Sequence, residues 1–415
     1  MKKSLYIALL LPVVLTSCKE DKYTARVTGL RLVSVDPKNG YPGDLVTLLG
    51  RNFSTDPAED IVTIGGVRAQ VLEAYKDRLL LILPENEPGQ YPIAVTAPSG
   101  SLEGLSVNYL KTPDHEYLVT TVVGQQGVRT CVDGVGTGAS TYLPTGINKA
   151  PDGTLWFTDR GGNRVRRIAP DLTVTTVVDA SASGAAVWQG CFDAAGNYWF
   201  NDKANGTLKR YNPADGKTVA VATGMKSPMN VAVDAAGNIY VPARDEKVVY
   251  RFDKDGGNKT VFAEVPDGPA YITFDPQGNL VSGTQNGYKI VSIAPDGTLR
   301  TIVGDGVKGD EASDGLEGDP LTATIGSAQG IDFDSKGVMY FTDMKFHNVR
   351  RLVPDASGDY AKGTLETIMG GVKGYADGKG LNVKFNEPDG LLVYDDNTLY
   401  VCDAQNCLIR KVNIR

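Results

Sequence analysis

The chain has 415 residues, with 42 basic and 49 acidic side chains and a formal net charge of −7. An acidic chain is a poor partner for the phosphate backbone of nucleic acids, so no nucleic-acid ligand is expected. The length exceeds what one hydrophobic core usually holds and predicts two domains. The 48 Gly, the 22 Pro and many β-branched residues, without helical periodicity, predict an all-β fold.

The N-terminus has the pattern of a secretory signal. Lys2 and Lys3 precede a mostly apolar run from Leu5 to Leu15, which is too short to span a bilayer as a stable helix. Small residues and Cys18 follow this run. We therefore expect residues 1–17 to be removed as a signal peptide.

Residues 15–18 read "LTSC", which resembles the lipobox of bacterial lipoproteins. The resemblance implies that Cys18 is lipidated and begins the mature chain, with residues 18–25 as a tether. The following "KEDK" of residues 19–22 resembles a tag that carries lipoproteins to the surface of glycan-degrading Gram-negative bacteria. An ordinary solvated tether is the alternative. The expected location is therefore the outer membrane, surface-exposed and anchored through the lipid alone.

Residues 26–111 alternate short apolar runs with Gly, Pro and Asn turns, which predicts a small sandwich of antiparallel strands. The stretches "VDPKNGYPGDLVTLLGRNF" and "DIVTIGGVRAQVLEA" resemble the immunoglobulin-like IPT/TIG domain. Such domains usually serve as spacers or docking modules, so the resemblance implies no chemistry for this part of the chain.

From Tyr117 onward one pattern recurs: an apolar strand, a turn, a second strand rich in Trp or Tyr, an Asp-led loop and a third strand ending in basic residues. The first repeats are about 40 residues long, the length of one propeller blade. Second strands such as "TLWFTD" and "VMYFTD" and third strands such as "RVRRIA" resemble the NHL family of propeller repeats. The turns of the six repeats fall at Gly153, Gly196, Gly237, Gly278, Gly337 and Asn397.

The sixth repeat stops at Arg415 after its third strand. The segment 116–124, "EYLVTTVVG", can supply the missing fourth strand and remove the exposed strand edges. We therefore predict that residues 112–415 form a six-bladed NHL-type β-propeller closed by this strand. Three Asp-Gly loops are expected to link the outer strand of one blade to the inner strand of the next, at residues 133–147, 314–331 and 377–391.

Ligands of propellers usually bind at one end of the central channel, where the inner strands begin and the loops after the second strands lie. The inner-strand residues at this end differ among the repeats. An aromatic ring there can stack on a sugar, and amides can hydrogen-bond its hydroxyls. The candidate ligand contacts are Trp188, Gln189, Asn230, Tyr271, Gln329 and Asp389.

Trp188 is the main candidate because it breaks the repeat pattern. Trp156 and Trp199 occupy the middle-strand position at which Tyr240 stands in the next repeat, so we expect them to pack between blades. The alternative for Trp188 is a place beneath the first long loop near Cys131.

Aspartates end most of the second strands, at Asp159, Asp202, Asp343 and Asp403. Because they recur blade by blade, we interpret them as carboxylates that accept hydrogen bonds from loop N–H groups; a metal or acid–base site would break the symmetry. The basic residues near them are more plausible ligand contacts. These residues are Arg160, Lys203, Arg244 and Lys345.

The sequence does not favour catalysis. His115 lies in the linker and His347 in one loop, too few histidines for the site of propeller lyases. Propeller lactonases bind a metal through Asn, Asp and Glu; Asn230 and Asp389 could supply two ligands, but no Glu stands at an equivalent position. No catalytic residue, metal or cofactor is therefore expected.

Four cysteines remain beyond the signal region, at Cys131, Cys191, Cys402 and Cys407. The last two flank a four-residue hairpin loop and could pair across it in an oxidising compartment. Free thiols are the alternative.

The leading interpretation is a cell-surface binding protein. The combination of TIG and NHL domains on a lipoprotein resembles accessory components of polysaccharide-uptake systems, which implies a poly- or oligosaccharide ligand and an outer-membrane transporter as partner. Two alternatives stay open: a protein–protein interaction scaffold at the outer membrane, and a metal-dependent lactonase- or lyase-like enzyme.

Overall fold

The computed structural model of the protein describes residues 29–87, 89–109, 115–309 and 318–415. Internal contacts divide the chain into two compact units, Met1–Tyr109 and Leu110–Arg415. The expected signal peptide, the lipidation site Cys18 and the tether lie outside the described residues. None of the described helices is long and apolar enough to cross a membrane.

The first unit contains two sheets, with the strand orders β1-β3-β7-β6 and β2-β9-β8-β4-β5. The short β2–β9 pair is parallel, and the other pairs are antiparallel. The strands are β1 (Arg31–Asp36), β2 (Asn39–Gly40), β3 (Leu45–Arg51), β4 (Ile61–Ile64), β5 (Val67–Arg68), β6 (Gln70–Tyr75), β7 (Arg78–Ile82), β8 (Gly89–Ala97) and β9 (Gly100–Tyr109).

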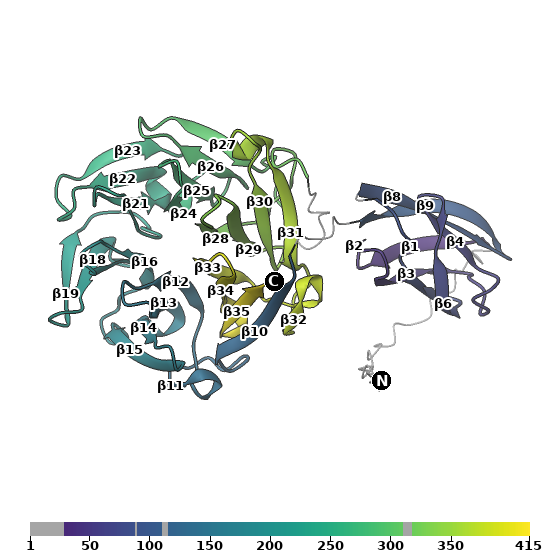
Figure 1. The fold of residues 1–415 in the computed structure, drawn as a ribbon, viewed down its shortest axis with the longest axis horizontal. Helices are drawn as coiled ribbons and strands as arrows, with labels where there is room; N and C mark the ends of the chain where they lie inside the picture. The colour runs from purple at the N-terminus through teal and green to yellow at the C-terminus, as the bar shows by residue number, and fades with distance from the viewer. Residues whose placement is uncertain (1–28, 88, 110–114, 310–317) are drawn as a thin grey trace, which may run out of the picture. The chain divides into compact units, whose positions relative to one another are not determined.

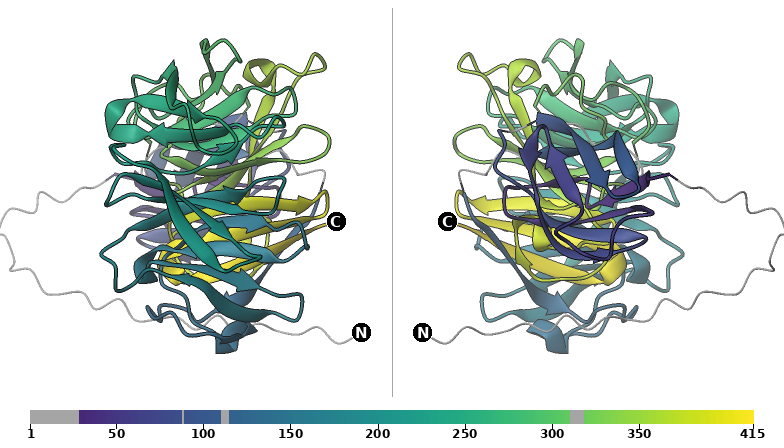
Figure 2. Two further views of the ribbon diagram at one scale, coloured as in Figure 1. Left: turned by 90° about the vertical axis from the view of Figure 1, so that its left-hand side faces the viewer. Right: turned by 90° about the vertical axis from the view of Figure 1, so that its right-hand side faces the viewer.

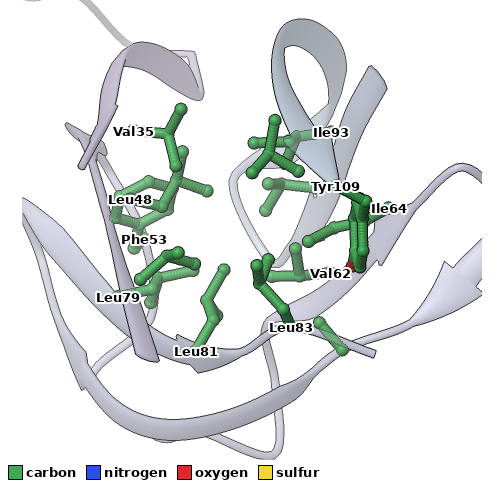
Figure 3. Close-up of a cluster of buried hydrophobic side chains, with 14 residues drawn as sticks. Val35, Leu48, Phe53, Val62, Ile64, Leu79, Leu81, Leu83, Ile93 and Tyr109 are labelled. Carbon is green, nitrogen blue, oxygen red and sulfur yellow. The ribbon is translucent and has the colours of Figure 1, made fainter. Parts of the chain in front are cut away.

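Sequence alternation in these strands places one face of each sheet in a shared core. In β3, Val46 and Leu48 are buried, whereas Leu45 and Leu49 are exposed. Figure 3 shows Leu48 of the first sheet and Ile93 of the second among the side chains that fill the space between the sheets. The predicted immunoglobulin-like sandwich is confirmed.

The described residues of the second unit form six sheets. Their orders are β11-β15-β14-β13-β12, β16-β17-β18-β19, β20-β21-β22-β23, β24-β25-β26-β27, β28-β29-β30-β31 and β32-β10-β35-β34-β33. The strands are β10 (Tyr117–Gly124), β11 (Gly134–Val135), β12 (Pro144–Lys149), β13 (Leu155–Asp159), β14 (Arg164–Ile168), β15 (Thr173–Asp179), β16 (Val187–Phe192), β17 (Tyr198–Asp202), β18 (Thr207–Asn212), β19 (Lys217–Ala222), β20 (Ala232–Val233), β21 (Ile239–Ala243), β22 (Val248–Phe252), β23 (Thr260–Glu264), β24 (Pro269–Phe274), β25 (Leu280–Thr284), β26 (Ile290–Ile293), β27 (Leu299–Val303), β28 (Ala328–Phe333), β29 (Met339–Asp343), β30 (Asn348–Val353), β31 (Thr364–Gly370), β32 (Gly378–Lys379), β33 (Pro388–Asp395), β34 (Thr398–Asp403) and β35 (Leu408–Ile414). Short 3-10 turns lie at Gly136–Gly138, Arg160–Gly162, Arg244–Glu246, Tyr360–Lys362, Gly380–Asn382 and Ala404–Asn406.

These sheets stand around a central axis, with β12, β16, β24, β28 and β33 on the inside (Figure 1), and Figure 2 shows them edge-on. The last sheet is completed by the first strand of the unit: β10 pairs antiparallel with β35, from Tyr117 opposite Ile414 to Gly124 opposite Leu408. This pairing covers the edge that β35 would otherwise expose. The predicted closure of the propeller by this segment is confirmed.

Large side chains of the second strands fill the spaces between neighbouring sheets. Trp156 is buried with Val187 and Tyr198 of the next sheet, and the centroids of the Trp156 and Tyr198 rings are 5.5 Å apart. Trp199 is buried in the same way with Ile239 and Val241 of the sheet that follows. The predicted packing role of these two tryptophans is confirmed.

The Asp-Gly loops clamp buried arginines of the third strands. Asp133 lies 2.9 Å from the guanidinium of Arg166, and Asp377 lies 2.7 Å from that of Arg410. Each arginine is fully buried and also pairs with the aspartate that ends the second strand of its own sheet. The loops add the short strands β11 and β32 to the outer edges of these sheets. In the remaining loop, residues 314–317 lie outside the described residues.

Candidate functional site

One end of the channel is formed by the beginnings of the inner strands and by the loops that follow the second strands. These segments meet because paired strands run antiparallel: Pro144 pairs with Asp159, and Val187 pairs with Asp202. We call this end the channel mouth. It is the end at which the sequence predicts ligand binding.

Three consecutive sheets place a cation directly after their second strands. Arg160 follows β13, Lys203 follows β17 and Arg244 follows β21. The equivalent residues of the other three sheets are uncharged: Gln285, Met344 and Ala404. The basic side chains therefore gather on one half of the ring, and we call them the cationic arc.

Trp188, the second residue of β16, lies within the cationic arc and is partly exposed. The guanidinium carbon of Arg160 lies 4.5 Å from the centroid of its ring, and the ammonium nitrogen of Lys203 lies 4.0 Å from it. Both distances are within the range of cation–π attraction. The ring thus serves as a platform for two cations and is not a bare stacking surface.

Trp188 belongs to none of the buried hydrophobic clusters of the described residues, in contrast to Trp156 and Trp199. The alternative prediction placed Trp188 beneath the first long loop, near Cys131. In the structure, the sulfur of Cys131 lies against the backbone of Gly162. The ring contacts of Trp188 within the described part of the chain are those with the two cations. Trp188 therefore lies outside the buried hydrophobic clusters of the described residues.

The cations of the arc differ in how they are neutralised. Arg244 pairs with Asp245 at 2.7 Å, whereas Arg160 and Lys203 have no ion pair among the described residues. The Nε of Arg160 is buried and has no hydrogen-bond partner there. Burial, followed by the charges of Arg244 and Arg160, lowers the pKa of Lys203 to about 8, against an opposing effect of Asp245.

A buried polar pair lies next to Trp188. The amide of Gln189 donates hydrogen bonds to the carbonyl of Thr145 at 2.5 Å and to Oδ1 of Asp389 at 2.7 Å. Burial raises the pKa of Asp389 to about 7, although the charge of Arg160 and the bond from Gln189 lower it. Asp389 therefore changes its charge near neutral pH.

Glycines let the backbones of three inner strands approach closely at this level. A Cβ added at Gly330 would lie 2.2 Å from the backbone nitrogen of Leu391, and one at Gly390 would lie 2.5 Å from the carbonyl oxygen of Thr145. Real Cβ atoms do not come so near to backbone atoms, so glycine is required at both positions.

The structure does not bring Asn230 and Tyr271 to the mouth as free ligand contacts. The amide of Asn230 both donates to and accepts from the backbone of Ile272, at 3.2 Å each. Tyr271 is buried in a hydrophobic cluster. Both residues line a cavity of about 210 Å³ formed by the later parts of the inner strands, which also contains Asp332. Both residues are thus buried within the channel, and their predicted role as ligand contacts stays a prediction.

Gln329 and Lys345 lie on the side of the ring away from the cationic arc. The amide of Gln329 donates to Oγ of Ser327 at 2.7 Å. Lys345 pairs with Glu387 at 3.3 Å, and Glu387 also accepts a hydrogen bond from Gln405. The sequence analysis did not predict that Glu387 and Gln405 lie at the mouth. Glu387 directly precedes the inner strand β33, and Gln405 lies in the loop after β34, so their places in the repeat could have indicated it. The predicted contacts therefore separate into an arc around Trp188 and a neutralised group opposite it.

The aspartates that end the second strands accept hydrogen bonds from the loops that precede the inner strands. The backbone N–H of Tyr142 donates to Asp159 at 2.6 Å, and that of Ala186 donates to Asp202 at 3.0 Å. Asp343 and Asp403 accept equivalent bonds. The predicted capping role is confirmed.

The residues that the structure describes contain no group of three or more His, Cys, Asp or Glu side chains placed to hold a metal ion. Cys131, Cys191, Cys402 and Cys407 are free thiols, so the pairing of the last two across their hairpin is not formed.

Comparison with known proteins identifies the first unit and the fold of the whole chain. Residues 30–111 match the IPT/TIG domain family. No curated protein sequence matches the chain. Solved structures do match in fold, and those described next are all below 25% identical.

A structural genomics protein of unknown function from Bacteroides thetaiotaomicron has a TM-score of 0.62 and 21% identity, covering 95% of this chain and 100% of that one. An auxiliary nutrient binding protein from the same organism has a TM-score of 0.62 and 20% identity, covering 93% and 98%. A putative phosphatase from that organism has a TM-score of 0.60 and 17% identity, covering 93% and 97%. At these identities the likeness establishes a shared fold.

Proposed function

We propose that this protein binds a nutrient carbohydrate at the channel mouth without cleaving it. The observation that carries the proposal is the partly exposed ring of Trp188 with Arg160 and Lys203 held against it. Aromatic side chains with adjacent hydrogen-bond donors are suited to the apolar faces and hydroxyl groups of sugars. Two structures of the same fold are described as auxiliary nutrient binding proteins, which supports a nutrient as the class of ligand.

The proposal includes the place of the protein in the cell. The sequence of residues 15–22 supports lipidation at Cys18 and export to the surface of the outer membrane. A lipoprotein in this position would hold its ligand near an outer-membrane polysaccharide transporter. Replacement of Cys18 by Ala should abolish incorporation of labelled fatty acid; a labelled Cys18→Ala protein would contradict this part of the proposal.

Affinity electrophoresis tests the binding function. Soluble residues 19–415 are run through native gels that each contain one polysaccharide, beside Trp188→Ala and the control Lys149→Met. Lys149 is exposed and lies 4.0 Å from the ring of Tyr394, so it matches the contact of Lys203 with Trp188 at another place. We expect one polysaccharide class to retard the wild type and the control but not Trp188→Ala.

The opposite results are equally clear. A protein that no polysaccharide retards would contradict carbohydrate binding and favour a scaffold that binds another protein. Release of reducing ends from a retarding polysaccharide would contradict the absence of catalysis.

A further inference from the structure

The uncompensated charges of the cationic arc are the starting point. Arg160 and Lys203 have no ion pair among the described residues, although neighbouring basic side chains do: Arg164 pairs with Asp179 at 3.0 Å and Arg244 pairs with Asp245 at 2.7 Å. The chain as a whole has more acidic than basic residues. Two cations that share one ring and form no ion pair are therefore unusual in this acidic chain.

Keeping these cations together costs free energy in the unliganded protein. Arg160 and Lys203 lie against the same indole ring, and the charge of Arg244 also acts on Lys203. The buried Nε of Arg160 lacks an acceptor among the described residues. A buried donor without an acceptor is normally avoided, and an oxyanion is the group that satisfies guanidinium and ammonium donors best.

Three of the acidic groups near the mouth are already engaged. Asp245 pairs with Arg244, and Glu387 pairs with Lys345 at 3.3 Å. Asp389 accepts the amide of Gln189 and is buried. Asp389 and Asp245 act on Arg160 and Lys203 only through their charges, and no described carboxylate forms an ion pair with either cation. The pair on Trp188 can therefore accept a negative charge from a ligand.

We infer that the channel mouth selects a carbohydrate that carries a negative charge, as a carboxylate or a sulfate. This inference rests on the carbohydrate-binding function proposed above and specifies its ligand. The guanidinium of Arg160 and the ammonium of Lys203 lie against one ring, so a sugar seated at Trp188 meets both. The oxyanion accepts their hydrogen bonds.

Isothermal titration calorimetry with matched probes tests this inference. The first pair is oligogalacturonide and its methyl ester, which have the same backbone but differ in charge. The second pair is dextran sulfate oligosaccharide and dextran oligosaccharide, which differ only in the sulfate groups. Oligosaccharides of galactan, mannan and dextran are the neutral set. We expect one charged probe to bind about tenfold or more tightly than its matched probe with the charge reduced, the change produced by losing a charge-assisted hydrogen bond.

The variants Lys203→Met and Arg160→Met should each remove most of the preference for the charged probe, whereas Lys149→Met should keep it.

Salt gives a second measurement that needs no variant. Raising sodium chloride from about 0.05 to 0.5 M should weaken the binding of the charged probe more than the binding of its matched probe, because salt screens ionic attraction.

Failure of the inference differs from failure of the proposed function. Equal affinity for charged and matched probes, or binding of the neutral set alone, would overturn the selection of an anion and leave carbohydrate binding intact. A preference that Lys203→Met and Arg160→Met both retain would also overturn it. Binding of none of the probes, together with no retardation by any polysaccharide in the gels, would overturn both proposals.

Discussion

Trp188 and Trp156 are the same residue type in opposite surroundings. Trp156 is buried between two sheets, whereas Trp188 is partly exposed and touches two cations. Trp156→Ala should therefore leave a cavity and lower the free energy of unfolding by about 3–5 kcal/mol. Trp188→Ala should lower it by less than about 1 kcal/mol, as expected for a substitution outside the core. Denaturant unfolding followed by circular dichroism measures both values.

The comparison has a clear contrary result. A Trp188→Ala protein that is destabilised as strongly as Trp156→Ala would show that Trp188 is a packing residue. Its loss of binding would then say nothing about a contact with ligand.

The charge of the mouth should depend on pH. Burial, followed by the charges of Arg244 and Arg160, lowers the pKa of Lys203 to about 8, and Asp245 opposes this effect. Lys203 therefore loses its proton as pH rises through about 8. Burial raises the pKa of Asp389 to about 7, against the lowering effects of Arg160 and Gln189 and with a small further rise from Glu387. Asp389 therefore gains its negative charge as pH rises through about 7. Both changes make the mouth less positive.

The affinity for the charged probe that binds should therefore fall between pH 6 and pH 9, by about tenfold for the loss of one charged contact. Calorimetry at these two pH values measures the change, and Lys203→Arg, which keeps its charge, should reduce the fall above pH 8. An affinity that is constant or rises over this range would contradict the assignment of these groups to the site.

At the scale of elements, one strand contains both a buried and an exposed ion pair. In β14, Arg166 and its partner Asp159 are fully buried, and Arg164 and its partner Asp179 are partly exposed. Arg166→Met leaves a buried carboxylate without its cation and should cost about 3 kcal/mol or more. Arg164→Met should cost less than about 1 kcal/mol.

Thermal and denaturant unfolding of these two variants test whether the Asp-Gly loop clamps a structural arginine. Equal and small effects would contradict that role. If the Arg166→Met protein is much less stable than Arg164→Met, the buried arginine needs its carboxylate partners. This need explains why the Asp-Gly loop recurs beside third strands that contain a buried arginine.

The sequence predicts the elements well because each follows from a local pattern. Strand alternation and turns locate the sheets, and the recurrence of Trp or Tyr places Trp156 in the core. The departure of Trp188 from this recurrence indicates its place at the mouth. Each of these inferences can be made from the sequence of a single segment.

The remaining features depend on which segments lie opposite each other. Asn230 was expected to face ligand, but its amide bonds to the backbone of the next inner strand. Glycine is required at Gly330 and Gly390 because neighbouring inner strands approach closely at these positions. The contact of Arg160 with Trp188 joins two neighbouring sheets. None of these pairings is encoded in the spacing of residues along the chain.

At the scale of the whole molecule, every residue of the candidate site comes from the second unit. Residues 112–415 should therefore bind the ligand of the full chain with an affinity within about twofold, because they contain all of the site residues named above. Calorimetry of the two proteins with the same oligosaccharide measures the ratio. A folded second unit that binds much more weakly would show that the IPT/TIG domain contributes to the site.

The central claim is that ligand binds against Trp188, and tryptophan fluorescence tests it most directly. Residues 19–415 and Trp188→Phe are titrated with an oligosaccharide of the polysaccharide that retards the protein in gels. The account predicts a saturable change of emission in the wild type that is absent in Trp188→Phe, because Trp156 and Trp199 are buried between sheets away from the mouth. The same saturable change in both proteins would contradict it.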